Sequence, residues 1–267
     1  MSRITNKFAD LRATGGKGFI PFVTAGDPDM EFSLAIILRL AELGASVIEL
    51  GVPFSDPMAD GPTIQRSSQR SLDAGTNLEK IFDLVKRFRE RSDVPLVLFS
   101  YLNPLLRFGF DRFCSHAVAT GVDGLLVTDV VGFEAIEIGN QLKANGLDLI
   151  SLIAPTTSDE RLAEICRIAS GFIYAVSRAG VTGVQKETSG GARVLVERAR
   201  RFTDLPIAVG FGISSAEQIR EVWQYADAAV VGSAIVAEIE RSVDDGNAVE
   251  AVEGLVSRLL PEIAKDV

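Results

Sequence analysis

The sequence predicts an α/β fold, a single domain over residues 1–267 built as a (β/α)8 barrel with extra helices. Three observations support this prediction. Short apolar segments alternate with helical segments of about 10 to 15 residues, which is the pattern of parallel βαβ units. Eight such units fit within 267 residues, and closed barrels of this kind use about 250 residues. Neither a linker nor a dinucleotide-binding GxGxxG motif after the first strand interrupts the alternation.

Apolar segments that end at turn-forming residues predict the first four strands, at residues 18–26, 45–53, 96–102 and 124–129. Helical periodicity predicts the helices that follow them, at residues 30–43, 63–74, 78–91, 111–120 and 135–144. Gly75 separates the second and third of these helices, because glycine is a common helix-stop residue.

The same signals predict the other four strands, at residues 147–155, 172–177, 206–210 and 228–232. Ser158 is expected to cap the helix after the fifth strand, and another helix is expected at 194–202. Each of the last two strands is followed by glycine or serine and then a helical segment. The connection 177–193 is long and polar with four glycines, so we expect a functional lid, with a disordered surface loop as the alternative.

The composition limits the classes of partner. Acidic residues outnumber basic residues, 36 against 27, and both are scattered along the chain, which carries a net charge of -9. This balance argues against a general affinity for nucleic acid or anionic lipid. No run of about 18 apolar residues is present, and the amino terminus lacks the apolar core of a secretory peptide. We therefore expect no membrane association and a cytoplasmic location.

The cysteines and the histidine exclude several kinds of site. Cys114 and Cys166 fall in predicted helices without CxxC or metal-ligand spacing, so we expect buried, reduced thiols. His116 is the single histidine, which excludes a histidine-rich metal centre, and its neighbours form no hydrolase signature. No metal site is expected.

Residues 47–65, VIELGVPFSDPMADGPTIQ, contain the principal candidate site. Glu49 lies in an apolar run, and a buried carboxylate is costly without a partner or a raised pKa. Asp56 and Asp60 follow in a loop, and barrels of this class place their sites at the carboxyl ends of strands. Two acids in two environments are suited to acid/base chemistry. The alternatives are an ion-paired interior charge for Glu49 and turn or cap roles for the aspartates.

Two glycine-containing turns after the seventh and eighth strands predict a phosphate site. They are Gly210 to Ser214, GFGIS, and Gly232-Ser233-Ala234. Glycine lets the backbone approach an anion closely, and late barrel strands with a short helix amino terminus often hold phosphate. Tight turns use the same residues, so the prediction rests on their joint placement.

Aromatic residues on or beside the strands are candidates for the walls of an apolar pocket for a planar substrate, with ordinary barrel packing as the alternative: Phe22, Tyr101, Tyr174 and Phe211. In the predicted lid, Thr182-Gly183 are expected to fold over the ligand, and Arg178 either assists an anion or is a solvated surface residue.

Five segments of the chain together resemble the alpha subunit of tryptophan synthase. They are IPFVTAGDPD at 20–29, ELGVPFSDPMADGPTIQ at 49–65, SRAGVTG at 177–183, GFGIS at 210–214 and VGSAIV at 231–236. The segments occur in family order and span nearly the whole chain. The 49–65 segment is highly specific, whereas GFGIS and GSA alone are not.

The resemblance implies a TIM barrel that cleaves indole-3-glycerol phosphate to indole and glyceraldehyde 3-phosphate, with no cofactor in this chain. It also implies a pyridoxal-phosphate beta subunit that receives the indole, in an alpha2-beta2 heterotetramer. The family's catalytic acids match Glu49 and Asp60. Its substrate-binding positions match Phe22, Tyr101, Tyr174, Thr182, Gly183, Phe211, Gly212, Gly232 and Ser233.

The chemistry agrees with these residue types. Breaking the bond between indole C3 and the glyceryl carbon requires protonation at C3, and Glu49 is the expected general acid. The ionised Glu49 then takes the glyceryl hydroxyl proton, while Asp60 stabilises positive charge at the ring nitrogen. A carboxylic acid that performs both steps near neutral pH needs a tuned environment.

The sequence departs from the family pattern at two positions. Asp129 is followed by Val130-Val131-Gly132-Phe133, where the family usually has a proline, in a loop that faces the partner. Phe99 occupies a position near the pocket that is often a smaller or more flexible apolar residue.

Two other functions remain as alternatives: another phosphate-binding barrel enzyme, such as an isomerase or indole-glycerol-phosphate synthase, and a non-catalytic activator. The first lacks an expected strand-end lysine, and intact Glu49 and Asp60 argue against the second.

Overall fold

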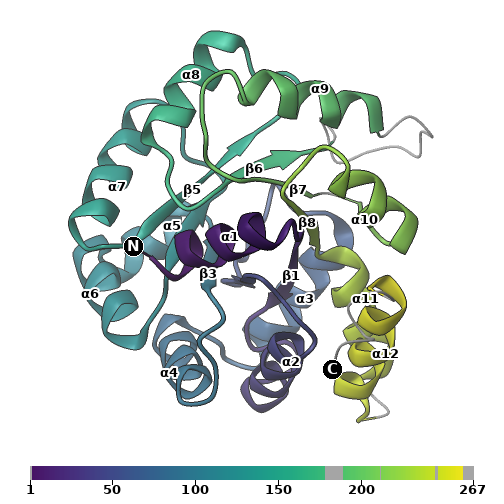
Figure 1. Cartoon of the computed structure of the whole chain (residues 1–267). Helices are drawn as coiled ribbons and strands as arrows, with labels where there is room; N and C mark the ends of the chain where they lie inside the picture. The colour runs from purple at the N-terminus through teal and green to yellow at the C-terminus, as the bar shows by residue number, and fades with distance from the viewer. Residues whose placement is uncertain (1, 178–188, 211, 244–245, 261–267) are drawn as a thin grey trace.

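Eight parallel strands close into one barrel in the computed structural model, which confirms the predicted (β/α)8 architecture (Figure 1). The structure describes residues 2–177, 189–210, 212–243 and 246–260. Each strand pairs with its neighbours in the chain, and β1 pairs with β8 to close the barrel. The strands are β1 (Gly18–Thr24), β2 (Ile48–Gly51), β3 (Leu96–Ser100), β4 (Gly124–Val127), β5 (Asp148–Ile153), β6 (Ile173–Val176), β7 (Ile207–Gly210) and β8 (Ala228–Val231).

Twelve helices occur in the described parts of the chain. They are α1 (Arg3–Thr14), α2 (Met30–Glu42), α3 (Pro62–Asp73), α4 (Leu78–Arg89), α5 (Leu102–Phe108), α6 (Phe110–Thr120), α7 (Phe133–Ala144), α8 (Asp159–Ile168), α9 (Ser189–Ala199), α10 (Ala216–Trp223), α11 (Ser233–Ser242) and α12 (Ala248–Leu259). No helix in these ranges has both the length and the apolar character needed to cross a membrane.

Most predicted elements agree with the structure within a few residues, and one prediction was wrong in extent. The helix after β6 begins at Ser189, five residues before the predicted 194, so the connection predicted as a lid is shorter than 177–193. Helix α5 was not predicted, because the apolar residues that follow β3 continue the strand pattern. Ser158 caps α8 as expected, since its hydroxyl accepts from the Arg161 amide at 3.3 Å.

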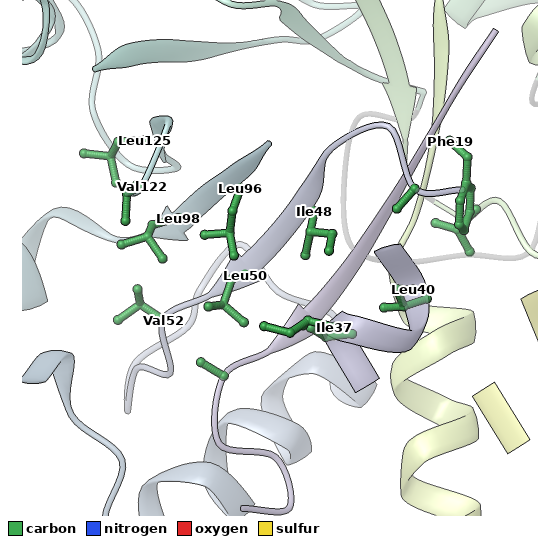
Figure 2. Close-up of a cluster of buried hydrophobic side chains, with 14 of the residues drawn as sticks. Phe19, Ile37, Leu40, Ile48, Leu50, Val52, Leu96, Leu98, Val122 and Leu125 are labelled. Carbon is green, nitrogen blue, oxygen red and sulfur yellow. The ribbon is translucent and has the colours of Figure 1, made fainter. Parts of the chain in front are cut away.

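The layer between barrel and helices is aliphatic. On β2, Ile48 and Leu50 point outward and are fully buried, and Leu96 and Leu98 do the same on β3. Figure 2 shows these side chains beside Ile37 of α2, in one continuous cluster. Burying one such side chain stabilises the fold by about 1.5–3 kcal/mol. The strict in-and-out alternation fixes which β2 residues face the barrel interior.

Helix α1 closes the amino-terminal end of the barrel, and Figure 1 shows it lying across that end. Its Ile4 and Phe8 join the interior cluster, where the Phe8 and Phe172 ring centroids are 5.8 Å apart. The Ser2 hydroxyl caps this helix by accepting from the Thr5 amide. Because this end is filled by side chains, the interior is accessible from the carboxyl ends of the strands.

Candidate active site

A pocket opens at the carboxyl ends of the barrel strands. It combines two carboxylates, aromatic walls and the backbone turns after β7 and β8. Its lining residues are Phe22, Glu49, Asp60, Ile64, Phe99, Tyr174, Gly212, Val230, Gly232 and Ser233. The structure therefore brings seven of the predicted site residues together from five strands or their following loops.

Glu49 lies inside the barrel because its β2 neighbours Ile48 and Leu50 point outward. Its side chain is 0% exposed, and neither carboxyl oxygen has a hydrogen-bond partner among the residues that the structure describes. Burial raises the pKa of Glu49 to about 8, since no neighbouring group compensates the loss of water. Glu49 is therefore protonated at neutral pH, and the alternative of an ion-paired interior charge finds no partner in the described ranges.

Asp60 lies at the end of the loop between β2 and α3, just before the Gly61 cap of that helix. Backbone contacts hold it: its amide donates to Pro57 O at 3.0 Å, and the Gln65 side chain donates to its carbonyl at 2.9 Å. Burial raises the pKa of Asp60 to about 6, and a hydrogen bond with the Tyr101 hydroxyl partly opposes this effect. Asp60 is therefore ionised at neutral pH, while Glu49 keeps its proton.

Asp56, the other acid of this loop, has a local role. Its side chain is exposed and accepts from the Ser55 hydroxyl at 2.6 Å, and its carbonyl accepts from the Met58 amide at 2.9 Å. It is not among the residues that line the pocket. The turn role considered from the sequence agrees with this geometry.

Aromatic side chains form the apolar walls of the pocket. The rings of Phe22 and Phe99 pack edge to face with centroids 5.3 Å apart, and Tyr174 is buried. Two glycines make room for them. A Cβ at Gly51 would stand 2.6 Å from the Phe22 ring, and one at Gly210 would collide with the Tyr174 hydroxyl. Burial, and secondarily the nearby Glu49, raises the pKa of the Tyr174 hydroxyl, which keeps its proton.

The turns after β7 and β8 offer backbone amides to an anion. Helix α11 begins at Ser233 with Gly232 as its N-cap, and no side chain of the described residues caps it. By contrast, the Ser215 hydroxyl caps α10, and the Ser214 amide donates to Gln218 at 2.8 Å, so Ser214 is already engaged. Gly212 is exposed with a φ of 80° and open space where a Cβ would be. Free amides at a helix amino terminus favour negative charge.

The remaining predicted residues lie elsewhere or outside the described ranges. Tyr101 is not among the pocket lining; its hydroxyl accepts from the Ala59 amide at 2.9 Å and its ring lies 5.2 Å from Phe54, so it supports the Asp60 loop. Thr182, Gly183 and Phe211, together with Arg178, lie outside the described residues.

Sequence reasoning missed two lining residues, Ile64 and Val230. Val230 could have been found from the alternation in β8, where it shares the inward face with Ala228. Ile64 had no such signal, because its place depends on how α3 packs against the barrel.

The cysteines and the histidine lie away from this pocket. Cys114 and Cys166 are buried free thiols, as predicted. His116 on α6 pairs its Nδ1 with the Arg112 carbonyl and packs on Phe82. Within the described ranges, no group of three or more His, Cys, Asp or Glu is arranged to hold a metal ion.

Comparison with known proteins agrees with the fold and identifies the family. The family model for the tryptophan synthase alpha chain matches residues 8–261. The chain is 47% identical over 265 residues to the tryptophan synthase alpha chain of Geobacter sp. (strain M21), covering 99% of each. It superposes on tryptophan synthase subunit alpha from Legionella pneumophila str. Paris with a TM-score of 0.91 at 33% identity, covering 99% of each chain. The Pyrococcus furiosus A-subunit gives a TM-score of 0.85 at 41% identity, with 91% of this chain and 98% of that one covered. The chain therefore belongs to the tryptophan synthase alpha chain family.

Proposed function

We propose that this chain, an enzyme of tryptophan biosynthesis by its family, catalyses the retro-aldol cleavage of indole-3-glycerol phosphate to indole and glyceraldehyde 3-phosphate. One observation carries the proposal: Glu49 is fully buried without a hydrogen-bond partner in the described chain, and it lines one pocket with Asp60. Proton transfer to a carbon atom requires a protonated acid, and an ionised acid in the same pocket can stabilise the positive charge that develops.

The pocket suits the two ends of this substrate. The indole ring fits between the Phe22, Phe99 and Tyr174 side chains, because a planar ring gains most from aromatic walls. The phosphate fits at the free amides of Gly232 and Ser233 and near Gly212. In this arrangement the scissile bond lies between the two ends, within the part of the pocket that Glu49 lines.

Glu49 carries the proton through the reaction. It donates its proton to indole C3, which gives a cationic indolenine with positive charge at N1. The bond between C3 and the glyceryl carbon then breaks, its electron pair restores the C2–C3 double bond, and N1 becomes neutral. The glyceryl hydroxyl loses its proton to the Glu49 carboxylate as the aldehyde forms. Glu49 is protonated again, so no external acid or base is consumed.

Asp60 stabilises the charge that develops on the ring. Its carboxylate accepts the N1–H hydrogen bond, and that bond strengthens as N1 becomes positive. Its raised pKa still leaves it ionised at neutral pH, because the Tyr101 hydrogen bond limits the rise. The two acids thereby hold opposite protonation states in one pocket.

The family implies a beta subunit as partner, and we infer that it carries the pyridoxal phosphate and accepts the indole in an alpha2-beta2 heterotetramer. The loop after β4 supports a contact on this side of the barrel. Val131 in this loop and Phe133 at the start of α7 are 60% and 71% exposed, and Asp129 holds the start of α5 by accepting from the Leu102 amide at 2.8 Å. Exposed large apolar side chains of this kind favour a protein contact.

Release of indole from indole-3-glycerol phosphate by the purified chain tests the proposal. The reaction is measured with the chain alone and with a pyridoxal-phosphate beta subunit. We expect indole in the first case and faster conversion in the second. Absence of turnover in both cases contradicts the proposal and favours the alternative of a non-catalytic activator.

A further inference from the structure

Helix α3, which begins just after Asp60, is attached to the barrel mainly by polar contacts. Its buried face carries Ser67, Ser68 and Ser71, and Ile64 is its one buried apolar residue. The Ser67 and Thr24 hydroxyls are 2.6 Å apart, and the Ser71 hydroxyl donates to the Ala25 carbonyl. Directional contacts such as these fix the register of a helix, whereas apolar packing alone allows it to slide.

Four charged residues extend this polar attachment to α11. Arg70 donates through Nε and Nη2 to both carboxyl oxygens of Asp27, at 2.8 Å each, and through Nη1 to Glu240 at 2.7 Å. Arg66 donates to both oxygens of the same Glu240, at 2.7 Å each. This ion-pair cluster of Asp27, Arg66, Arg70 and Glu240 joins the loop after β1, α3 and α11.

The contacts of Arg70 in this ion-pair cluster require an arginine side chain. The Asp27 side chain is 1% exposed, and burial raises its pKa while Arg70 opposes that rise. Hydrogen bonds from Arg66 and then Arg70 lower the pKa of Glu240 to about 2. A guanidinium fork can bind one carboxylate with two nitrogens and a second carboxylate with the third, which a lysine ammonium cannot do.

Helices α3 and α11 both begin at the pocket and pack against each other (Figure 1). Near their starts, Ile64 and Val236 form one apolar cluster with Phe22. Arg70 and Glu240 lie further along, about 12 and 10 Å from the first residues of their helices at 1.5 Å rise per residue. The ion-pair cluster therefore joins the two helices beyond their starts, and those starts carry Asp60 and the Gly232-Ser233 amides.

We propose that Arg70 is a positioning residue that sets the spacing between Asp60 and the phosphate-binding amino terminus of α11. The inference rests on the proposed function, because the substrate must reach both helix starts at once. A shift of about 1 Å in such a spacing can cost on the order of 100-fold in rate. Arg70 itself touches neither substrate nor the reacting atoms in this arrangement.

The test uses Arg70→Lys in the full chain, with Arg87→Lys as the matched control. Arg87 also makes a bidentate pair, with Glu31 at 2.7 Å, but on the exposed surface between α4 and α2. Two quantities are measured on folded protein: the Kd for glycerol 3-phosphate, and kcat/KM for indole-3-glycerol phosphate relative to unphosphorylated indole-3-glycerol.

We expect Arg70→Lys to leave the Kd for glycerol 3-phosphate within about twofold, because that ligand meets only the α11 amides, and to lower kcat/KM much more for the phosphorylated substrate than for the unphosphorylated one. Arg87→Lys should change neither quantity. A general loss of stability lowers both substrates' rates alike, so the ratio separates positioning from a structural role. Equal ratios in wild type and Arg70→Lys overturn the inference.

Glu240→Gln gives a second route if Arg70→Lys does not fold, because it leaves the Arg70–Asp27 pair intact. It should lower the ratio of the two kcat/KM values in the same direction and by a smaller factor, and an unchanged ratio overturns the inference. A wild-type chain that binds no glycerol 3-phosphate overturns the proposed phosphate site and the inference together. That outcome is distinct from a wild type that binds glycerol 3-phosphate and variants whose kcat/KM ratio is unchanged, which overturns the inference alone.

Discussion

Glu49 and Asp60 line the same pocket from two different environments. Glu49 is fully buried and has no hydrogen-bond partner in the described chain, whereas Asp60 is partly exposed and interacts with the Tyr101 hydroxyl. Burial raises the pKa of Glu49 to about 8 and that of Asp60 to about 6. Near pH 7 the pair therefore consists of one acid with its proton and one without it.

The pair predicts a bell-shaped pH dependence of kcat/KM. Activity should rise as Asp60 loses its proton near pH 6 and fall as Glu49 loses its proton near pH 8. Steady-state indole formation between about pH 5 and 9 measures both limbs. Activity that stays level through pH 9 contradicts the role of Glu49 as general acid.

A control shows whether the acidic limb of the pH profile comes from the enzyme or from the substrate. A phosphate ester has its own second pKa near 6, which overlaps with Asp60. The profile is therefore repeated with unphosphorylated indole-3-glycerol, and an acidic limb that persists belongs to the enzyme.

Tyr101→Phe should move that acidic limb to higher pH. The hydroxyl lowers the pKa of Asp60 and accepts from the Ala59 amide at 2.9 Å, while the phenylalanine ring keeps the packing on Phe54. We expect a shift upward of about half a unit or more, with the basic limb unchanged. If the acidic limb stays in place, Tyr101 does not tune Asp60.

Glu49→Gln should change how stability depends on pH. The folded pKa of Glu49 is raised to about 8 from its ordinary value of 4.5, so between these values the folded state holds a proton that the unfolded state has released. The free energy of unfolding of the wild type therefore falls as pH rises through this window.

The Glu49→Gln variant has no ionisable group at this position, so its free energy of unfolding does not fall in this way. Its stability relative to wild type should grow from about pH 5 to pH 8.5 by an amount on the order of a few kcal/mol, since one pKa unit is ~1.4 kcal/mol. Urea unfolding at both pH values measures the difference. Parallel stability curves for the two proteins show that Glu49 is ionised in the folded state.

Gly210→Ala should displace the Tyr174 ring, because a Cβ at this position collides with the Tyr174 hydroxyl. The indole wall is lost while α11 and its free amides remain. We expect KM for indole-3-glycerol phosphate to rise about tenfold or more, and the Kd for glycerol 3-phosphate to stay within about twofold. Double substitution with Tyr174→Phe should restore part of the loss, and no change in KM contradicts the assignment of this wall.

The sequence was sufficient to predict the barrel and the inward position of Glu49, because both depend on local patterns. Alternation of apolar residues in β2 places Ile48 and Leu50 outward and thereby Glu49 inward. The glycine turns after β7 and β8 likewise have fixed places in the chain.

What the sequence could not predict depends on tertiary packing. Tyr101 carries the pattern of a pocket wall, yet its hydroxyl bonds the Asp60 loop. Ile64 reaches the pocket only because α3 packs against α11, and the bonds of Arg70 to Asp27 and Glu240 span 43 and 170 residues of sequence. Pairings at such separations leave no periodic signal in a single chain.

Indole release from indole-3-glycerol phosphate by Glu49→Gln, compared with wild type, tests the central claim most directly. The amide keeps the shape of the side chain but cannot donate and retrieve a proton, so the rate should fall by about 10²- to 10⁴-fold or more. Binding of glycerol 3-phosphate should remain within about twofold of wild type, because the α11 amides are untouched. Near-normal turnover by Glu49→Gln, with the same phosphate binding, contradicts the assignment of Glu49 as the proton carrier.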